Sequence, residues 1–347
     1  MISSSNNNSR ITVDGTICIG NKIVCDGFLY DKPVAIFTHI HEDHIRQIDS
    51  ALNCCDVYVS KQTKDLLIEI KDDSPLIYRN NLFGLEFDKV IDYDGDKITL
   101  FPTKHILGSS QVLVETENDQ RIVYTSDFDM PGTKPIECNT LIIDATHGSK
   151  EYIHNHDKEK ILNDFVDVVN TELRHENPVV IKAHRGQLQE LMAILSDTLE
   201  LSVPFITGKK EKALARIHRK YQYKIRENKD LLEIDLPESQ NLISSNNPYV
   251  RFISSPIKVE DQRICYIRVS SDIAFKSSTS PPWYKNKLKN TYSFNLSNHA
   301  DFNGIINYIK ETNANLVITD RSRSYYGNEL ANEIKSTLKN VDAITLP

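Results

Sequence analysis

Three imidazoles and two carboxylates lie in the segment 39–44, whose sequence is HIHEDH. The apolar run 34–37 precedes it directly, and its Val, Ala, Ile and Phe side chains predict a buried strand. The polar segment therefore begins where a strand ends, which is where open α/β sheets present their ligand-binding groups. This pattern predicts an α/β protein with a functional site at one edge of a sheet.

The spacing within this segment favours metal binding. Side chains alternate along an extended chain, so His39 and His41 point to the same side. The next two residues, Asp43 and His44, are expected to point in a different direction. One metal ion held by the first pair and a second ion held by the other pair is the simplest interpretation. Imidazole and carboxylate suit zinc, and paired ions stabilise both the attacking and the leaving oxygen of a displacement. The alternative is a solvated loop that is rich in histidine.

Composition sets the class of protein. The chain has 347 residues, of which 39% are hydrophobic and 26% charged, as in a globular protein with one large or two ordinary domains. No apolar run reaches the ~18–20 residues of a membrane span, and the N-terminal segment lacks the features of a signal peptide. The six cysteines form no CxxC pair, which is typical of reduced thiols. We therefore expect a cytoplasmic protein without a membrane partner.

Four further polar side chains follow apolar, strand-like runs. They are His105, Asp127, Asp144 and His299. One such residue alone more often marks a turn or a helix cap. Four of them, together with the segment 39–44, indicate that one edge of a sheet collects possible metal ligands.

These residues together resemble the metallo-β-lactamase superfamily and, within it, the β-CASP nucleases of RNA processing and DNA repair. The segment 39–44 resembles the main metal motif, His105 the third-motif histidine and Asp127 the aspartate that bridges two ions. Asp144 resembles the motif A acid, and His299 the motif B histidine. The segment 183–191, AHRGQLQEL, is similar to the GR-x-QE segment that opens a helix of the cap domain. The resemblance covers nearly the whole chain after the N-terminal tail.

The resemblance implies an αββα metallo-β-lactamase sandwich with an inserted β-CASP cap domain. The expected organisation is a disordered tail at 1–9, the first part of the metallo-β-lactamase domain at 10–157, the cap at 158–290 and the last part of the main domain at 291–347. It also implies two zinc ions. The expected ligands are His39, His41 and His105 for the first ion, Asp43 and His44 for the second, and Asp127 between them. Catalytic roles are expected for His299, as the acid that protonates the leaving oxygen, for Asp43, and for Asp144, which would accept a proton from a ligand imidazole or steer the attacking water.

One position departs from the family pattern. RNA-processing members carry a ligand histidine, motif C, on the strand after motif B, whereas this chain has Asp320 there. A carboxylate can ligate zinc, so Asp320 is a candidate ligand of the second ion. The alternative is a strand-end carboxylate paired with Arg321 or Arg323. DNA-repair members also lack this histidine, so the change does not decide between RNA and DNA.

The middle of the chain carries most of the local positive charge. Residues 209–229 hold nine Lys or Arg against two Glu, in a chain of net charge −7, and the segment 283–289 adds aromatic and basic residues. Basic side chains and stacking rings hold single strands, although a basic helix is more often a solvated face. The candidate nucleic-acid-binding residues are His184, Arg185, Lys209, Lys210 and Lys212.

The sequence therefore predicts a zinc-dependent hydrolase that cleaves phosphodiester bonds of single-stranded RNA, as in mRNA 3′-end processing or decay. A DNA exonuclease of the repair type is the alternative within the same class. A non-catalytic nucleic-acid-binding subunit and a hydrolase of small thioesters or lactams are alternatives of other classes. Endonuclease or exonuclease mode stays open, and the apolar strand 343–346 would allow a homodimer.

Overall fold

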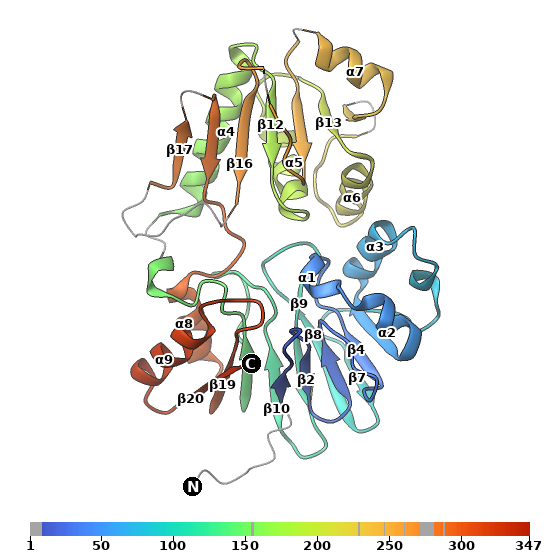
Figure 1. Cartoon of the computed structure of the whole chain (residues 1–347), viewed down its shortest axis with the longest axis vertical. Helices are drawn as coiled ribbons and strands as arrows, with labels where there is room; N and C mark the ends of the chain where they lie inside the picture. The colour runs from blue at the N-terminus through green and yellow to red at the C-terminus, as the bar shows by residue number, and fades with distance from the viewer. Residues whose placement is uncertain are drawn as a thin grey trace. The chain divides into compact units, whose positions relative to one another are not determined.

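The computed structural model describes residues 9–153, 156–227, 230–245, 247–259, 261–270, 281–286 and 289–347. The chain divides into two compact units. Unit 1 comprises Met1–Ile153 and Asn298–Pro347, and unit 2 comprises His154–Ser297. Unit 1 is thus built from both ends of the chain and unit 2 from its middle, as the colours of Figure 1 show. The predicted tail at 1–9 lies outside the described residues, apart from Ser9.

Two sheets form the centre of unit 1. The strands of the first sheet, in spatial order, are β1 (Arg10–Ile11), β2 (Ile17–Ile19), β3 (Ile23–Cys25), β4 (Val34–Ile36), β5 (Asp56–Ser60) and β6 (Leu82–Leu85). The strands of the second sheet, in spatial order, are β20 (Asp342–Leu346), β19 (Leu316–Asp320), β11 (Thr140–Ile143), β10 (Arg121–Tyr124), β9 (Ser110–Glu115), β8 (Asp96–Pro102) and β7 (Val90–Tyr93). The parallel partners β10, β11, β19 and β20 put their carboxyl ends at one edge.

Alternating side chains of the second sheet serve two different cores. In β9, Val112 and Val114 join the apolar cluster that contains Ile17, Ile23 and other residues of the first sheet. Leu113, between them in sequence, belongs to a second cluster. Successive side chains of a strand point to opposite faces, so one strand can contribute to the layer between the sheets and to the layer outside them.

Helices cover the outer faces of both sheets. On the side of the first sheet lie α1 (Glu42–Ile45), α2 (Ile48–Cys54), α3 (Lys61–Ile70) and the 3-10 turn η1 (Pro75–Tyr78), and α2 and α3 pack on β5. The second sheet is covered by α8 (Phe302–Glu311) and α9 (Gly327–Thr337), and the short η2 (Lys150–Tyr152) packs on α8. Helix α8 buries Phe302, Ile305, Ile306 and Ile309, a spacing that puts them on one helical face. The predicted α/β sandwich is confirmed, with layers in the order αββα.

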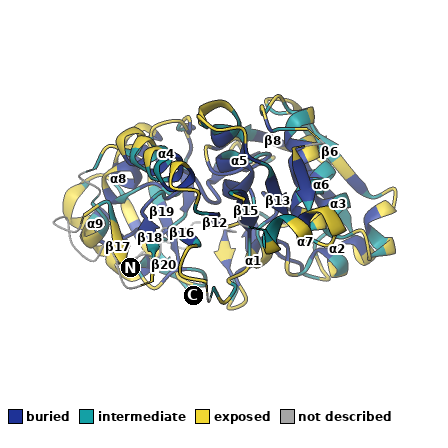
Figure 2. Ribbon diagram, turned by 90° about the horizontal axis from the view of Figure 1, so that it is seen from above, coloured by how far each residue is buried: buried dark blue, intermediate teal, exposed yellow. Residues whose placement is uncertain are grey.

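Unit 2 is a single sheet with helices around it. Its strands, in spatial order, are β14 (Leu231–Glu233), β13 (Phe205–Thr207), β15 (Val250–Ile253), β12 (Val179–Lys182), β16 (Cys265–Val269), β18 (Thr291–Phe294) and β17 (Trp283–Asn286). Its helices are α4 (Lys158–Arg174), α5 (Gln187–Thr198), α6 (Lys209–Lys220) and α7 (Pro237–Ser244). All pairings are parallel except that of β17 with β18, as the alternation of strands and helices in the sequence predicts. In Figure 2 the central strands of this sheet are dark blue, whereas exposed residues lie on the helices and on the edge strand β17.

One predicted boundary needs correction. The sequence interpretation ended the inserted segment at 290 and assigned everything after it to the main domain. Strand β18 instead pairs with β16 and β17, so it belongs to the sheet of unit 2, which ends at Ser297. The apolar run Thr291–Phe294 looks the same in either sheet, which is why the sequence pattern alone does not locate the boundary. Identifying unit 2 with a β-CASP cap stays a prediction.

Within the described ranges, every helix is too short or too polar to cross a lipid bilayer.

Candidate metal centre

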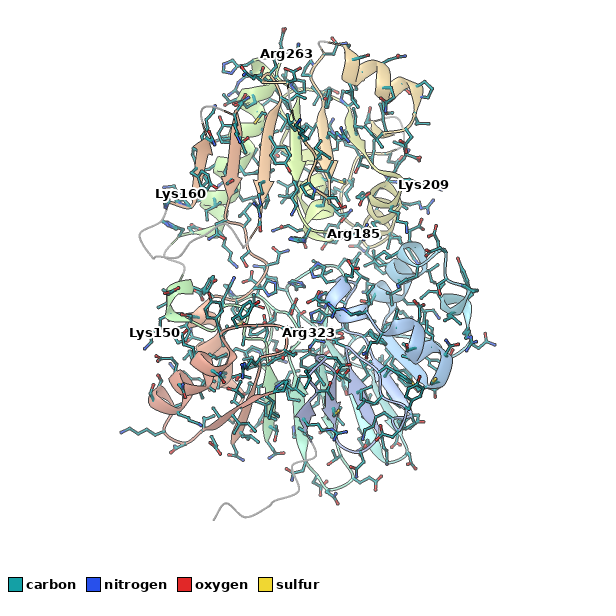
Figure 3. All side chains as sticks on the ribbon, in the orientation of Figure 1. Lys150, Lys160, Arg185, Lys209, Arg263 and Arg323 are labelled. Atoms are coloured by element: carbon teal, nitrogen blue, oxygen red, sulfur yellow. The ribbon has the colours of Figure 1, made fainter. Side chains whose placement is uncertain are left out.

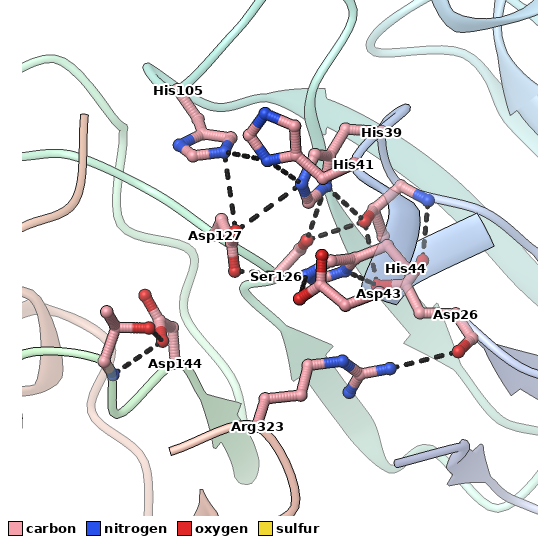
Figure 4. A network of polar contacts seen from close by, with 12 residues as sticks. Asp26, His39, His41, Asp43, His44, His105, Ser126, Asp127, Asp144 and Arg323 are labelled. Carbon is pink, nitrogen blue, oxygen red and sulfur yellow. Dashed lines mark hydrogen bonds and ion pairs between the residues drawn. The ribbon is translucent and has the colours of Figure 1, made fainter. Parts of the chain in front are cut away.

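Three histidines and one aspartate of unit 1 converge, although they come from segments far apart in sequence (Figure 4). His39 Nε2 and His105 Nε2 each lie 3.1 Å from His41 Nδ1. Asp127 Oδ2 lies 3.5 Å from His39 Nε2 and 3.4 Å from His105 Nε2. Two nitrogens bound to one tetrahedral zinc at ~2.0–2.1 Å would be roughly 3.3 Å apart. The four ligand atoms therefore have the spacing that a single metal ion requires.

The local chain explains why these atoms meet. His39 and His41 follow β4, and their alternation keeps both rings on one side. His105 follows β8, and its Nδ1–H donates to the backbone oxygen of Asn298 at 2.9 Å. This hydrogen bond leaves Nε2 of His105 without its proton and directed at the other two rings.

Burial keeps two of the rings in the form that binds metal. His39 and His105 are almost completely inaccessible to water. Burial lowers the pKa of His39 to about 3, and the charge of the neighbouring His44 lowers it further, against the opposing effect of Asp127. Burial likewise lowers the pKa of His105 well below its usual value. A metal ligand must be deprotonated, and these shifts favour neutral imidazoles over the physiological range.

His44 presents a second donor from another direction. Its Nδ1–H donates to Asp26 Oδ2 at 2.7 Å, so Nε2 is the nitrogen that can ligate a metal. Burial lowers the pKa of His44, but the carboxylates of Asp127 and Asp26 outweigh it and raise the pKa well above its usual value, so a bound cation would have to displace the proton on Nε2. That Nε2 is buried and has no hydrogen-bond partner, and it lies 3.4 Å from Asp127 Oδ1 and 3.5 Å from Asp43 Oδ2. A buried polar atom without a partner costs about 1–3 kcal/mol, a cost that a bound cation would remove. His44 Nε2 thus faces two carboxylates, of which Asp127 also belongs to the cluster of His39, His41 and His105.

Asp26 is a residue of this site that the sequence interpretation missed. Its carboxylate accepts hydrogen bonds from the Thr38 N–H at 2.8 Å, the Thr38 hydroxyl at 2.9 Å and the Tyr124 hydroxyl at 2.9 Å, besides His44. Burial raises the pKa of Asp26, but the charges of His44 and Arg323 outweigh it and the pKa is lowered. Asp26 follows the apolar strand β3 as Asp127 follows β10, so the same signal was available.

Two residues beside the site have an unusual backbone. Asp26 has φ +50° and Ser126, which precedes Asp127, has φ +53°. Residues other than glycine seldom adopt this left-handed conformation, and it persists where surrounding contacts fix it. The Ser126 hydroxyl lies 2.6 Å from that of Thr38 and 3.4 Å from Nδ1 of His39. The strained turn thus places Asp127 and supports a ligand ring.

His299 and Asp144 form a pair at the edge of the cluster. His299 Nδ1 lies 3.1 Å from Asp144 Oδ2, and its Nε2 lies 3.9 Å from Asp127 Oδ2. The other Asp144 oxygen accepts from the N–H and hydroxyl of Thr146 at 2.8 and 2.6 Å. Burial lowers the pKa of His299, but the carboxylates of Asp127 and Asp144 outweigh it and raise the pKa to about 9. Asp144 is therefore paired with His299, and these two residues converge with Asp127 as a second group of possible metal ligands.

Asp320 lies elsewhere. Its Oδ2 accepts from Arg323 NH1 at 3.0 Å, and its Oδ1 accepts from the Ser322 N–H at 2.8 Å. Among the residues that the structure describes, it joins neither group of converging metal-type donors. The structure thus has the ion pair that was the alternative to metal ligation. Asp43, by contrast, lies within reach of the second donor set, with its side chain 53% exposed.

In unit 2 the predicted nucleic-acid-binding residues lie at the start of α5 and of α6, as the labels of Arg185 and Lys209 in Figure 3 indicate. His184 is exposed in the turn before α5, and Arg185 Nε lies 3.6 Å from Glu211 Oε1. Lys209 and Lys210 are exposed on the first turn of α6, whereas Lys212 Nζ lies 3.5 Å from Glu233. Lys285, from the aromatic and basic segment, lies 3.3 Å from Glu172 and supports the sheet edge. The basic residues are therefore partly neutralised within the unit.

The fold and the donor set define an α/β sandwich with a histidine-rich, metal-type centre. A solved protein of unknown function from Enterococcus faecalis V583 has the same fold, with a TM-score of 0.61 at 15% identity over 90% of this chain and 79% of that one. The chain is 34% identical over 141 residues to an uncharacterized protein in the lig 3′ region of Acidianus ambivalens, covering 98% of that protein and 40% of this chain. The chain belongs to the family of that protein. No model of a known protein family matches it.

Two longer relatives carry functional names. The chain is 22% identical over 289 residues to a probable DNA ligase of Opitutus terrae, which is 81% of this chain and 26% of that protein. It is 27% identical over 128 residues to RNase aCSPSF2 of Saccharolobus solfataricus, which is 34% of this chain and 25% of that protein. The chain thus matches about a quarter of the length of either relative.

Proposed function

We propose that this protein is a metal-dependent phosphodiesterase that cleaves nucleic acid, a nuclease of the β-CASP type. The observation that carries the proposal is the convergence of His39, His41, His105 and Asp127, with the unpartnered Nε2 of His44 on the other side of Asp127. Neutral, buried imidazoles and a shared carboxylate are the donors that zinc prefers. A solvated histidine loop would leave these nitrogens in contact with water.

Each residue of the centre has its own proposed role in hydrolysis. His39, His41 and His105 would hold one zinc ion, Asp43 and His44 a second, and Asp127 both. Bound zinc supplies hydroxide near neutral pH and neutralises charge on the phosphate. Asp26 fixes His44 in the tautomer whose Nε2 faces Asp127, because its carboxylate accepts the Nδ1 proton.

His299 is the candidate for protonating the leaving oxygen. Asp144 accepts from Nδ1 of His299, which orients the ring so that Nε2 faces Asp127. A positioned acid of this kind contributes about 10²–10⁴-fold to the rate of a proton-coupled step. Asp144 would thus act through His299, and Asp43 as a ligand near the attacking water.

Two names among the relatives support an action on nucleic acid. The match of 128 residues to an RNase supports cleavage of single-stranded RNA. Cleavage of DNA is the second candidate, because the match to the probable DNA ligase extends over 81% of this chain. A segment like this chain within a ligase polypeptide would suit trimming of DNA ends before joining.

The test is digestion of end-labelled single-stranded RNA and DNA, side by side, by the purified protein with measured zinc content. We expect cleavage that a chelator abolishes and added zinc restores. A protein that takes up zinc yet binds both polymers without cutting them would instead be a non-catalytic binding subunit. Cutting that survives complete removal of metal would exclude the proposal.

A further inference from the structure

Arg323 links the loop that contains Asp26 to the end of the strand that contains Asp320, close to the candidate donors of the second ion. Its NH2 donates to the backbone oxygen of Asp26 at 3.0 Å (Figure 4). Its NH1 donates to Asp320 Oδ2 at 3.0 Å. The side chain is only 14% exposed. The position of Gly15 leaves room for it, because a Cβ at that residue would lie 3.2 Å from the guanidinium carbon. The arginine is therefore held within the fold rather than extended into solvent.

Asp26 connects Arg323 to His44. Asp26 is in the left-handed backbone conformation, which persists only where neighbouring groups fix it. Arg323 holds the carbonyl of that residue, and the carboxylate of the same residue holds Nδ1 of His44. A change in the Asp26 backbone would therefore turn the carboxylate, and with it the imidazole whose Nε2 faces Asp127.

We propose that Arg323, clamped by Asp320, is a positioning residue for His44 and so determines how tightly the second cation binds. This inference rests on the proposed two-ion function. It assigns Asp320 a purpose that does not require metal ligation, since the carboxylate orients the guanidinium toward Asp26. His39, a donor of the first ion, is linked to Asp26 less directly, because the Thr38 hydroxyl lies 2.9 Å from the Asp26 carboxylate and 3.1 Å from His39 Nδ1. The first ion should therefore be affected much less than the second.

The experiment is titration of the metal-free protein with Co²⁺, followed by calorimetry and by the visible absorption of the bound ion. In Arg323→Gln we expect one of two Co²⁺ affinities to fall by about tenfold, the size typical of losing a group that orients a ligand. The other affinity and its spectrum should stay close to the wild-type value. Arg323→Lys keeps the charge and should recover part of the loss.

Arg121→Gln is the matched control. Arg121 also joins a carboxylate, that of Glu115, to a backbone oxygen, that of Glu137, but it lies at the start of β10, away from Asp127. This variant should bind both ions normally. If Arg323→Gln does not fold, Asp320→Asn tests the same clamp, and we expect a smaller loss at the same ion.

The outcomes separate the two proposals. Wild-type protein that takes up no second Co²⁺ overturns the two-ion function and this inference together. Wild-type protein that binds two Co²⁺ ions, with both affinities unchanged in Arg323→Gln or in a folded Asp320→Asn, overturns the inference alone. A lower melting temperature in these variants with intact binding would mean that Arg323 is only structural.

Discussion

The polar residues of unit 1 and the basic residues of unit 2 were both singled out by sequence, yet the fold treats them differently. In unit 1 His39 and His105 are buried, and the Nε2 atom of each lies 3.1 Å from Nδ1 of the half-buried His41. In unit 2 several cations of the basic segment serve the fold itself. Arg219 donates to the backbone oxygen of Arg226 at 2.6 Å, and Arg226 lies over the ring of Phe205. Burial compels polar groups to find partners, whereas exposed charge carries no such constraint.

The largest effect should follow from Asp127→Asn, because this residue faces both donor sets. Removing its charge should lower turnover by more than the ~10²–10⁴-fold that loss of a single proton-transfer group costs. It should also lower bound zinc, measured by atomic absorption. Asp129→Asn, a buried carboxylate two residues further on, is the control and should retain both. A fully active Asp127→Asn protein would mean that the converging residues of unit 1 are no better supported as a functional site than the basic residues of unit 2.

His299→Ala should separate chemistry from binding. The variant keeps every predicted ligand, so zinc content should be normal, while turnover falls by about 10²–10⁴-fold. Asp144→Asn, which leaves His299 in place, should cost less. The measurement is single-turnover cleavage with metal analysis of the same samples. Undiminished cleavage by His299→Ala would show that this pair takes no part in the reaction.

Removal of positive charge from α6 should have a moderate effect. If Lys209 and Lys210 contact phosphates, Lys209→Ala with Lys210→Ala should weaken oligonucleotide binding and reduce the salt dependence of log K by about 0.7 per lysine. Lys212→Ala should do less because Lys212 lies beside Glu233. Lys224→Ala, near Asp197, serves as control. An affinity that changes neither with salt nor with these substitutions would mean that α6 is a solvated face.

The smallest effect concerns stability alone. His218 is buried in unit 2, and burial lowers its pKa to about 4, against 6.5 in an unfolded chain. The neutral form is the native one, so its contribution to stability is full above pH 6.5 and is lost as the pH falls toward 4, because the unfolded chain binds the proton first. At about 1.4 kcal/mol per pKa unit, up to roughly 3 kcal/mol is at stake. Urea unfolding of His218→Gln should lose this part of the pH dependence while cleavage at neutral pH stays normal.

The sequence predicted elements well where periodicity was strong. The apolar periodicity of the sequence predicts helices at 159–175 and 187–199, and the structure has α4 at Lys158–Arg174 and α5 at Gln187–Thr198. The same pattern predicts a basic helix at 209–226, but α6 ends at Lys220. The chain then turns through Gln222, whose φ is +71°, so that Ile225 can enter the core. Tertiary packing, which a local pattern does not contain, ends this helix.

The site was predictable in its members but not in its contacts. Histidines and aspartates after apolar strands were found because strand ends share one sheet edge. The pairing of Asp144 with His299 and of Asp320 with Arg323 depends on how loops fold back, and sequence spacing does not encode it. Asp26 is the opposite case. It follows an apolar strand as the other residues do, but the sequence interpretation placed it inside a longer strand. The metal roles of all these residues stay predictions.

The division of unit 1 between the two ends of the chain bears on its biosynthesis. During translation, the first 153 residues emerge with His39, His41, His105 and Asp127. The backbone oxygen of Asn298, which accepts the hydrogen bond from His105 Nδ1, is made only after the whole of unit 2. Domains generally fold as they leave the ribosome. A nascent chain would therefore carry an unfinished centre until residues 298–347 follow the whole of unit 2 out of the ribosome.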